Sequence, residues 1–493
     1  MDLAVGTPLY IVGQECGYCH GKKDPDLQAY SLASYEEKYK AGVAPFQGYP
    51  TPGMICCHVY MSTPEVYESM MNRGFRRSGS FLYRQDPLRG CCRSYTIRSN
   101  LHMLRPSKDH RHTVNKFVKY ICGEPKKGKN ERFDLHSIII QSELSTERFR
   151  SVIGPPKFTP EKYALYFKYQ TTIHNEDPKE VSEKGFKNFL CESSFPMEYG
   201  ELRPESYWER LNTWRTKKLS TIRGLPIEGP VHECYYIDDK LVAIAVLDLL
   251  PESVSSVYFI WDPDYAHLSL GTLSALRECV LTEQLSKKYY YLGYYIDDCQ
   301  KMRYKAKFGG EILDVTSLKY YELDRLKTVT NCNGLIAMST DASPKEEIFI
   351  PPTNTIGLLD DKSNVAEHLY GVNGVGFAAS EKTAKSLGGH FGLEFYNKQT
   401  DADLWKPCSD PYATKLPLVC PGLLPLRQVS EDLERGKLAL LFRYCFILGE
   451  SSQHLELFNF KDSEYGEHRE HFLNLLRMFG AELFLNNKIA LIS

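Results

Sequence analysis

Residues 231–237 read Val-His-Glu-Cys-Tyr-Tyr-Ile and residues 241–249 read Leu-Val-Ala-Ile-Ala-Val-Leu-Asp-Leu, and this stretch decides the fold. Both runs are rich in the β-branched and aromatic residues that favour strands. Asp238-Asp239-Lys240 separates them and is typical of a tight turn, so the two runs predict a hairpin. Residues 255–261 predict a third strand.

A helix and a further strand follow this hairpin. Ser269 is a favourable N-cap, and apolar residues recur near helical spacing, which predicts a helix over 270–286; they are Leu273, Leu276, Val280 and Leu285. Residues 289–296 return to a strand pattern. A strand–helix–strand unit lays its two strands parallel in one sheet. The sequence therefore predicts an α+β or α/β fold with a mixed sheet.

Four cysteines in two pairs lie upstream of this unit: Cys16 and Cys19 in Cys-Gly-Tyr-Cys, and the adjacent Cys91 and Cys92. Thiolates bind soft or borderline cations, and a two-residue spacer lets both sulfurs of the first pair face one ion. Structural zinc sites usually have a spacer in both pairs, whereas iron–sulfur ligation accepts more varied spacing, so zinc and a cluster both stay open. Buried cysteines also serve as small hydrophobes, and Cys56-Cys57 offers a third pair.

The same cysteines belong to blocks of sequence that resemble a known family. Three blocks closely resemble the N-terminal region of eukaryotic arginyl-tRNA protein transferases. They are residues 16–19, residues 74–83 (Gly-Phe-Arg-Arg-Ser-Gly-Ser-Phe-Leu-Tyr) and residues 91–98 (Cys-Cys-Arg-Ser-Tyr-Thr-Ile-Arg). The catalytic half of these transferases is similar to residues 229–236, 256–265 and 291–296, together with Cys299, Lys301, Met302, Tyr304 and Lys305. Residues 14–98 and 155–320 carry the resemblance.

The resemblance implies a cysteine-rich N-terminal domain that holds an iron–sulfur cluster or zinc, and a catalytic domain of the acetyltransferase-like (GNAT) type. In such a domain the start of the helix at residue 270 has a clear use. Unpaired backbone N–H groups at Leu270, Gly271 and Thr272, with the positive end of the helix dipole, predict a site for phosphate or a developing oxyanion. This site could receive the terminal adenosine of tRNA. The alternative is an ordinary capped helix.

The implied reaction transfers arginine from the 3′ end of arginyl-tRNA to the α-amine of proteins that begin with Asp or Glu, which marks them for degradation by the N-degron pathway. Whether oxidised N-terminal cysteine is also accepted stays open. The ester is already activated, so the enzyme mainly aligns the amine and stabilises the tetrahedral oxyanion. No nucleotide cofactor is expected.

Two charged groups must be recognised, and they need opposite partners. The arginyl guanidinium needs carboxylates or an aromatic wall; the candidates are Glu233, Asp262, Asp264, Asp297, Asp298, Tyr258, Tyr294 and Tyr295. The acidic acceptor residue needs cations, which could equally bind RNA phosphate; the candidates are Arg76, Arg77, Lys301 and Lys305, with Tyr304 added to the substrate site by the resemblance.

The predicted catalytic residues are His232, Glu233, Tyr258 and Asp262. His232 or Glu233 could act as the base, but adjacent residues of a strand point to opposite faces, so they cannot form one acid–base pair. A lone Asp at the end of a strand, such as Asp262, is also a common turn former.

Charge is concentrated in one segment of an otherwise balanced chain. The formal net charge of the 493 residues is −2, which argues against nonspecific coating of nucleic acid and against a DNA partner. Residues 101–133, however, hold nine Lys or Arg against three acids, with His102, His110 and His112. This segment predicts a contact with tRNA or a solvated basic linker.

Composition is ordinary for a soluble globular protein, with 42% hydrophobic and 25% charged residues. No run of about 18 apolar residues and no basic-then-apolar start is present, so we expect neither a membrane partner nor a secretory signal. Free cysteines suit a reducing compartment, which means the cytoplasm or the nucleus. We expect a monomer.

The length predicts more than one domain. We expect a cysteine-rich domain over residues 1–100, a basic linker or tRNA-contact segment over 101–133, the catalytic region over 134–330, and a C-terminal α/β region over 331–493 that packs on the catalytic core. In that last region, strands are expected near 438–448 and 489–492, with a helix near 471–479.

Two rival functions come from other classes. An acetyl-CoA dependent acetyltransferase would have the same fold, although residues 261–272 contain one glycine and no Gly-rich pyrophosphate loop. The second rival is a noncatalytic metal-binding adaptor that recognises acidic N-termini. Binding of arginyl-tRNA would separate the transferase from both.

Overall fold

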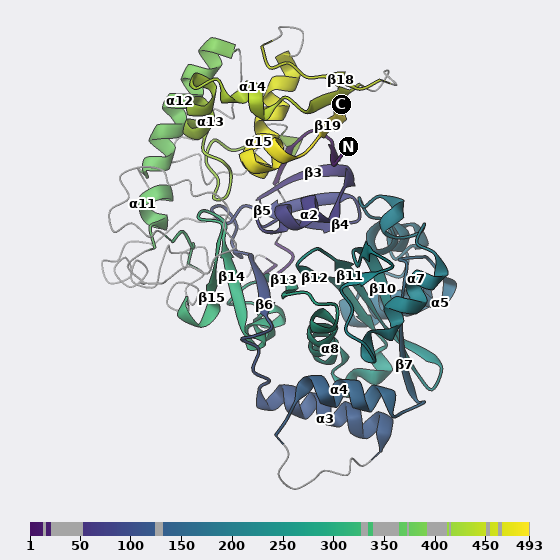
Figure 1. Cartoon of the computed structure of the whole chain (residues 1–493). Coiled ribbons are helices and arrows are strands. Elements are labelled where there is room, and N and C mark those ends of the chain that lie inside the picture. Colours follow the sequence, from purple (N-terminus) through teal and green to yellow (C-terminus); the bar gives the residue numbers. More distant parts are fainter. Residues whose placement is uncertain are drawn as a thin grey trace, which may run out of the picture.

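The computed structural model describes residues 1–12, 16–20, 53–123, 132–326, 334–338, 364–371, 374–391, 412–413, 416–449, 454–461 and 466–492. Two large sheets organise these residues (Figure 1). Of the basic segment predicted over 101–133, residues 124–131 lie outside the described residues.

The predicted hairpin is confirmed within an eight-stranded sheet. β10 (Gly229–Ile237) and β11 (Lys240–Leu249) pair antiparallel, and the turn between them has positive φ at Asp238 and Asp239 (48° and 61°), as the tightest hairpin turns require. β12 (Ser253–Trp261) pairs antiparallel with β11. Local sequence signals are therefore sufficient to predict β10, β11 and β12.

The strand–helix–strand unit is also confirmed. α8 (Leu270–Gln284) connects β12 to β13 (Tyr289–Tyr295), and the two strands pair in parallel. The predicted capping role of the Ser269 side chain is wrong: Ser269 occupies the N-cap position with φ of 53° and its side chain accepts no capping hydrogen bond. α8 is buried along most of its length, which explains why its apolar residues are not confined to one stripe.

Strands from distant parts of the chain complete this sheet. Its order is β15-β14-β6-β13-β12-β11-β10-β7. The added strands are β6 (Tyr95–Asn100), β7 (Phe149–Gly154), β14 (Gly310–Asp314) and β15 (Lys319–Glu322). β6 lies between β13 and β14, so a segment next to the Cys91-Cys92 pair enters the same sheet as the hairpin.

Helices and short turns surround the eight-stranded sheet. They are α3 (Lys108–Cys122), α4 (Leu135–Leu144), α5 (Pro160–Tyr169), η2 (Gln170–His174), α6 (Glu183–Phe186), η3 (Lys187–Cys191), η4 (Met197–Tyr199), α7 (Glu205–Leu211), η5 (Asn212–Arg215), η6 (Pro263–Leu268), α9 (Gln300–Arg303), η7 (Tyr304–Phe308) and η8 (Leu323–Arg325). A two-stranded ribbon, β8 (Thr221–Ile222) and β9 (Leu225–Pro226), lies among them. In Figure 1, α3 and α4 form a layer beyond α8 at one end of the molecule.

The second sheet contains both ends of the described chain. Its main path is β16-β2-β3-β1-β19-β17-β18, with β5 and β4 branching from β3. These strands are β1 (Leu3–Val5), β2 (Leu9–Val12), β3 (Gly53–Ser62), β4 (Arg76–Ser78), β5 (Phe81–Gln85), β16 (Tyr412–Ala413), β17 (Cys445–Leu448), β18 (Glu456–Leu457) and β19 (Ile489–Ile492). β1 pairs in parallel with β19, so the first and last strands are neighbours.

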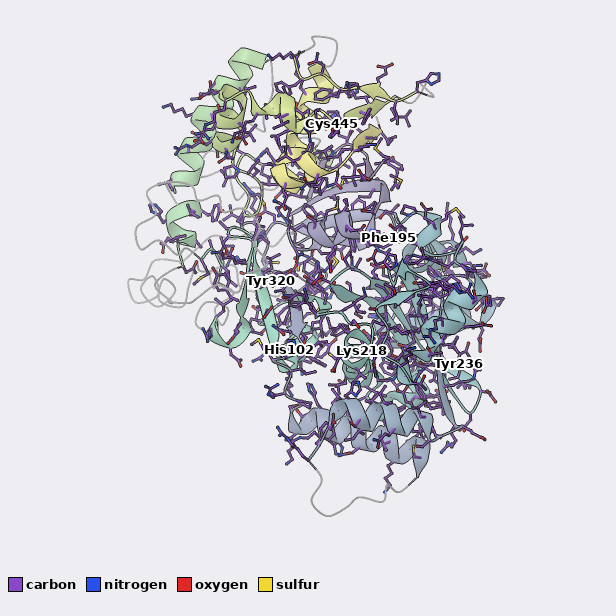
Figure 2. The ribbon with its side chains drawn as sticks, in the orientation of Figure 1. His102, Phe195, Lys218, Tyr236, Tyr320 and Cys445 are labelled. Atoms are coloured by element: carbon purple, nitrogen blue, oxygen red, sulfur yellow. The ribbon has the colours of Figure 1, made fainter. Side chains whose placement is uncertain are left out.

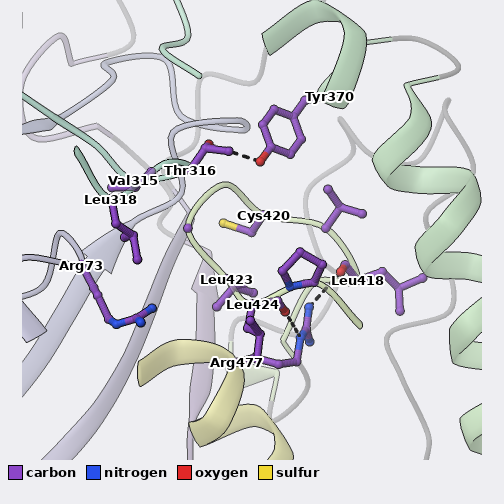
Figure 3. Close-up of a pocket in the computed structure, with 13 residues that line it drawn as sticks. Arg73, Val315, Thr316, Leu318, Tyr370, Leu418, Cys420, Leu423, Leu424 and Arg477 are labelled. Carbon is purple, nitrogen blue, oxygen red and sulfur yellow. Dashed lines mark hydrogen bonds between the residues drawn. The ribbon is translucent and has the colours of Figure 1, made fainter. Parts of the chain in front are cut away.

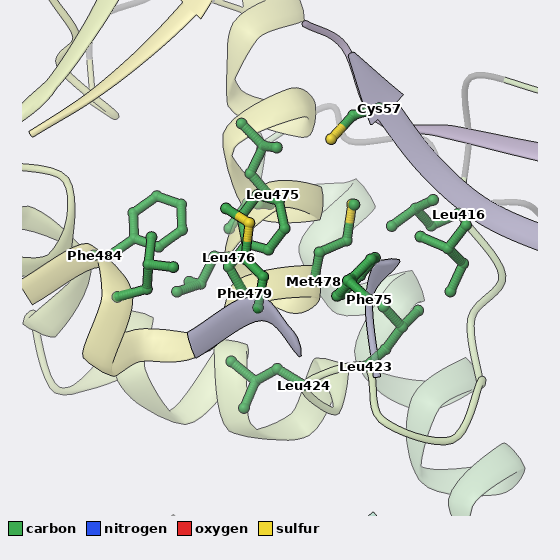
Figure 4. Packing of buried hydrophobic residues seen from close by; sticks show 14 of the residues in the cluster. Cys57, Phe75, Leu416, Leu423, Leu424, Leu475, Leu476, Met478, Phe479 and Phe484 are labelled. Carbon is green, nitrogen blue, oxygen red and sulfur yellow. The ribbon is translucent and has the colours of Figure 1, made fainter. Parts of the chain in front are cut away.

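One hydrophobic core joins the two ends of the chain. Figure 4 shows Cys57 and Phe75 close to Leu475, Met478 and Phe479 of the C-terminal helix. Cys57 is fully buried, and the adjacent Cys56 faces the Leu9 carbonyl at 3.7 Å. Of the interpretations open for the Cys56-Cys57 pair, ordinary packing in this core is the one that the contacts support.

The helices that pack around this core are α2 (Pro64–Met71), α11 (Ala366–Tyr370), α12 (Val375–Phe391), α13 (Leu426–Glu434), α14 (Lys437–Leu441) and α15 (Gly466–Asn486). The strand expected over 438–448 is half wrong, because residues 437–441 are helical and only Cys445–Leu448 is a strand. The predicted helix and last strand are confirmed. Within the described residues, no helix is long and apolar enough to cross a membrane.

A buried ion pair ties the two sheets together. Arg77 of β4 donates two hydrogen bonds to Asp248 of β11, at 2.8 and 2.6 Å, and both side chains are buried. Phe195, labelled in Figure 2, packs under the Arg77 guanidinium and against Tyr67 of α2. Since both sheets contain strands from the N-terminal 100 residues, the limits of the four expected regions stay predictions.

Candidate functional site

The parallel strands β12 and β13 diverge. They pair only from Ser253 with Tyr289 to Ser255 with Tyr291, although β12 runs on to Trp261 and β13 to Tyr295. β12 carries a register irregularity at this point, because Val246 pairs with Tyr258 and Leu247 with Ser256. We call the diverging segments, residues 256–261 and 292–295, the fork. Backbone groups that would otherwise pair across the fork can face a ligand.

α8 begins at the open end of the fork. Thr272 N–H donates to Ser269 O at 3.0 Å within the first turn, so the first-turn donors without an intrahelical partner are those of Leu270 and Gly271. A Cβ added at Gly271 would meet no atom within 4 Å. The space beside Gly271 is therefore open, as a ligand at this helix end would require.

An aromatic wall lines the β12 side of the fork. The Tyr258 ring lies 5.1 Å from the Phe189 ring and 6.3 Å from the Tyr169 ring, and Trp261 lies 5.8 Å from Tyr169. The Tyr258 hydroxyl donates to Gln170 Oε1 at 3.0 Å. Burial raises the pKa of Tyr258 above its ordinary value, so the hydroxyl is neutral near pH 7. The sequence did not predict that Phe189 and Tyr169 lie in this wall, because they belong to separate helices.

Asp262 follows the end of β12 and is already paired. Its carboxylate accepts from Lys168 at 2.6 Å and from Lys240 at 2.8 Å, and Asp264 shares Lys168 at 2.7 Å. Burial acts to raise the pKa of Asp262, but hydrogen bonds from the two lysines hold the pKa below its usual value. A bound guanidinium would have to join or displace these lysines, which the sequence reasoning did not include.

His232 and Glu233 lie on opposite faces of β10, as expected, and both are buried. His232 Nε2 lies 2.9 Å from Leu190 O and Nδ1 lies 3.2 Å from Lys162 Nζ. These contacts fit a neutral ring that donates from Nε2 and accepts at Nδ1. Burial and the nearby Lys162 lower the pKa of His232 to about 3.

Glu233 faces α8 and belongs to a buried ionic network. It accepts from Ser151 at 2.5 Å and from Arg277 at 3.2 Å, and Arg277 also pairs with Glu143 at 2.5 Å. Neither His232 nor Glu233 lies in the fork, although both were predicted as bases.

Arg76 and Lys305 are two buried cations that both contact Tyr294 of β13. Arg76 is 6% exposed, and its guanidinium lies over the rings of Tyr291 and Tyr294 at 5.4 and 5.6 Å. Its Nη1 donates to Phe75 O at 2.8 Å, but within the described residues Nε and Nη2 have no hydrogen-bond partner. Lys305 Nζ donates to Tyr294 O at 2.7 Å.

The electrostatics of this pair are unusual. Burial, and next the Arg76 charge, lower the pKa of Lys305 to about 7. The groups acting on that pKa also include Cys299, and no carboxylate of the described residues is among them. Buried cations are normally paired. We call Arg76, Lys305 and the adjoining Tyr83 and Tyr294 the cation cluster.

The other expected substrate residues surround these features. Arg77 is held by Asp248 and is not available to a ligand. Lys301, Tyr304 and Asp298 are exposed on the segment after β13, and Tyr295 donates to Asp297 at 2.5 Å. Tyr294 is buried and donates to Gly74 O at 2.8 Å. The structure thus brings Tyr294 and Lys305 to one place and leaves Lys301 and Asp298 facing solvent.

The four cysteines come together as expected. The sulfurs of Cys16, Cys19, Cys91 and Cys92 all lie within 4.8 Å of one another, and Cys19 and Cys91 are 3.5 Å apart. Hydrogen bonds from Cys91 and Cys92 lower the pKa of Cys16, so a thiolate is favoured in this set. Ile296, Cys299 and Met302 pack against the cluster, which places it next to the segment that carries Lys305.

A recess elsewhere in the molecule contains none of the predicted residues. It has a cavity volume of about 20 Å³, room for about one water molecule, and is lined by Arg73, Tyr370, Cys420 and Arg477 among others (Figure 3). Arg477 donates to the carbonyls of Pro417 and Leu418 at 2.7 and 2.8 Å, so its guanidinium is satisfied by main chain.

The chain is similar to known proteins along most of its length. Two family models match: the arginine-tRNA-protein transferase N terminus over residues 14–112 and the C terminus over residues 161–314. Arginyl-tRNA–protein transferase 1 of Saccharomyces cerevisiae is 36% identical over 482 residues, which is 95% of this chain and 94% of that protein.

Other relatives match shorter stretches of the chain. Arginyl-tRNA–protein transferase 1 of Drosophila melanogaster is 40% identical over 159 residues, 31% of this chain and 28% of that protein. An aspartate/glutamate leucyltransferase of Vibrio cholerae is 32% identical over 251 residues, 50% of this chain and 80% of that protein. A solved C-terminal domain described as a lysylphosphatidylglycerol synthetase from Agrobacterium fabrum overlaps with a TM-score of 0.23 and 10% identity over 50% of this chain and 62% of that chain, too low to inform the fold.

Proposed function

The chain belongs to the arginyl-tRNA–protein transferases, and from this we propose that its acceptors are proteins whose first residue is Asp or Glu, recognised by the cation cluster. As a member of this family the chain is an aminoacyltransferase that uses tRNA and protein substrates. The proposal concerns the acceptor, the residues that hold each substrate, and the metal.

The observation that carries the proposal is the pair of buried cations. Arg76 has two nitrogens, Nε and Nη2, that lack a partner within the described residues, and its charge helps to lower the pKa of Lys305, which contacts the same Tyr294. A protein tolerates such a costly arrangement when an anion completes it. The carboxylate of an N-terminal Asp or Glu would accept from Arg76 and attract the Lys305 proton. An N-terminal Ala would leave both cations unpaired.

The donor fits the fork. We propose that the fork and the start of α8 together form the donor site of an acetyltransferase-like domain. The terminal adenosine of arginyl-tRNA would lie at the Leu270 and Gly271 N–H groups, and the arginyl guanidinium against the wall of Tyr258, Tyr169 and Trp261. Asp262, Asp264, Asp297 and Tyr295 stay candidates at the edges of this site.

The reaction needs little acid–base help. The acceptor α-amine has an ordinary pKa of about 7.7 to 8.0, so part of it is neutral near pH 7 and can attack the ester carbonyl. The new amide bond forms as the ester C–O bond breaks, and the ribose hydroxyl leaves with the proton that the amine gives up. His232 and Glu233 contribute through the fold in this scheme, since both are buried and already paired. Lys301, Tyr304 and Asp298 would contact the substrates from the exposed segment.

The cysteine cluster fits a metal centre. A tetrahedral ion with bonds of about 2.3 Å holds its four thiolates about 3.8 Å apart, which is compatible with sulfurs inside 4.8 Å. Zinc or an iron–sulfur cluster would supply a structural cross-link between residues 16–19 and 91–92. The chemistry of transfer does not use it. Free cysteines suit a reducing compartment, so we propose that the enzyme acts in the cytoplasm or nucleus, and we keep the expectation of a monomer.

The donor specificity gives the direct test. The metal-replete protein would be incubated with a peptide that begins with Asp and with labelled arginyl-tRNA, leucyl-tRNA or acetyl-CoA. We expect label in the peptide from arginyl-tRNA only. Transfer from acetyl-CoA would favour the acetyltransferase, and peptide binding without transfer would favour the adaptor. Transfer from leucyl-tRNA would assign the donor preference named in the Vibrio cholerae relative.

A further inference from the structure

One face of α3 is exposed and basic along its whole length. The exposed residues Lys108, His112, Lys116 and Lys119 follow one another at spacings of three to four residues, and the exposed Arg111 lies beside them, so all five are on one side of the helix. The stripe from Lys108 to Lys119 extends about 17 Å along the helix axis.

The opposite face of α3 holds the helix in place. Val114, Phe117 and Ile121 are buried, and the Phe117 ring lies 5.1 Å from Phe149 of β7. Ser107 caps the helix by accepting from His110 N at 3.2 Å. The packing of the helix therefore rests on its apolar face and not on the exposed basic side chains.

Acids do not neutralise the stripe from within the helix. Asp109 is the single acidic residue of α3, and it already pairs with Lys307 of η7 at 2.6 Å. Residues 101–123 also contribute the exposed Arg105. The surface that results is positive over several turns.

Both ends of α3 contact elements of the candidate site. Near its start, the His110 ring lies 4.6 Å from Phe308 of η7, the element that carries Lys305. Near its end, the Tyr120 ring lies 5.6 Å from His267 of η6, which leads into the first turn of α8. In Figure 1 the helix runs past α8. A polyanion lying on the stripe would thus have one end close to the fork.

We infer that the basic face of α3 binds the phosphate backbone of a stem of the donor tRNA, so that the 3′ end of the tRNA reaches the fork. The inference rests on the proposed use of arginyl-tRNA. Phosphate neutralisation by lysine and arginine supplies most sequence-independent affinity for nucleic acid and makes it salt-dependent. Backbone contacts position the RNA without reading its sequence.

The test is a charge reversal of the stripe in the full chain, K108E/R111E/K116E/K119E. The matched control, K382E/K385E/K461E/K488E, changes the same charge on exposed residues of the other sheet region. Uncharged tRNA binding would be measured between 50 and 200 mM salt, with thermal unfolding to show that both variants fold.

We expect the stripe variant to bind tRNA about 100-fold more weakly at the low-salt end, and the slope of log affinity against log salt to fall by about 3 to 4, close to 0.9 per lost contact. Its maximal transfer rate at saturating arginyl-tRNA and its KM for the acceptor peptide should stay within about twofold of wild type. The control variant should match wild type throughout.

An unchanged affinity and slope, or an equal loss in the control, would overturn the inference. A raised acceptor KM with unchanged tRNA affinity would also overturn it and would assign the face to acidic acceptor proteins. Failure of the proposed function is a separate result, because wild type would then transfer no arginine at any tRNA concentration.

Discussion

Replacing Arg76 by Met, written R76M, should weaken recognition of the acceptor while leaving the protein at least as stable. In the unliganded protein, Arg76 keeps two buried N–H groups without a partner within the described residues, and each such group costs about 1–3 kcal/mol. Two cation–π contacts and the hydrogen bond to Phe75 O offset part of this cost, at roughly 1 kcal/mol each. We therefore expect R76M to raise the free energy of unfolding by about 1 kcal/mol.

The effect on activity should be large and confined to acidic acceptors. A bound carboxylate loses two charge-assisted hydrogen bonds in R76M, together worth about 3–4 kcal/mol, which corresponds to a fall in kcat/KM of about 10²- to 10³-fold. The assay is transfer of labelled arginine at saturating arginyl-tRNA to matched peptides that begin with Asp or Ala. The slow background transfer to the Ala peptide should stay unchanged.

The neighbouring arginine provides the control. Arg77→Met removes the partner of buried Asp248, so an uncompensated charge remains and the protein should lose about 3–5 kcal/mol of stability. Opposite shifts in the thermal midpoint of two adjacent substitutions are thus expected. A lowered midpoint for R76M, or an equal loss of activity on Asp and Ala peptides, would refute the reasoning.

Three further predictions concern the other site residues. Burial and the Arg76 charge lower the pKa of Lys305 to about 7, so Lys305 is charged below pH 7 and loses its proton as the pH rises through 7. The KM for an Asp peptide, measured from pH 6 to 8.5, should therefore rise by up to about tenfold per pH unit above 7. The K305R variant stays charged and should flatten this dependence. Asp262→Asn breaks the ion pairs with Lys168 and Lys240, and because both lysine side chains are about half exposed, the loss of stability should be at most about 1 kcal/mol. The same substitution should slow transfer at limiting arginyl-tRNA. An unchanged rate would remove Asp262 from the site. The Cys16→Ala and Cys91→Ala variants should lose bound metal, because both residues belong to the sulfur cluster. The C56A/C57A variant should retain the metal. Equal metal content in wild type and in a variant that lacks Cys16, Cys19, Cys91 and Cys92 would contradict the ligand set.

Local signals account for what the sequence predicted well. The hairpin of β10 and β11 and the unit of β12, α8 and β13 follow from strand runs, an Asp-Asp turn and helical spacing within residues 229–295. The cysteine cluster was also predictable, because a Cys-x-x-Cys knuckle and a second pair need one common ion. The hairpin and the strand–helix–strand unit require no knowledge of distant contacts.

Long-range pairing explains what the sequence could not predict. β6 lies between β13 and β14, and β1 pairs with β19 from the opposite end of the chain. The sequence of neither β6 nor β1 indicates which strands it will pair with. The same holds for charged side chains. Arg76 and Arg77 are adjacent and looked equivalent, yet Asp248, 171 residues away, occupies only Arg77. The ion pairs of Glu233 with Arg277 and of Asp262 with Lys168 could not be predicted either, because the partners are distant in the sequence.

The central claim is that two buried cations select an acidic N-terminal residue, and a comparison of isosteric acceptors tests it most directly. Single-turnover transfer from arginyl-tRNA would be measured for two peptides that differ only in Asp or Asn at the first position. Because Asn removes the charge and keeps the shape, we predict that Asp reacts at least about 100-fold more efficiently, corresponding to about 3 kcal/mol. Equal efficiencies for Asp and Asn would contradict the account, since the charges of Arg76 and Lys305 would then not select the acceptor.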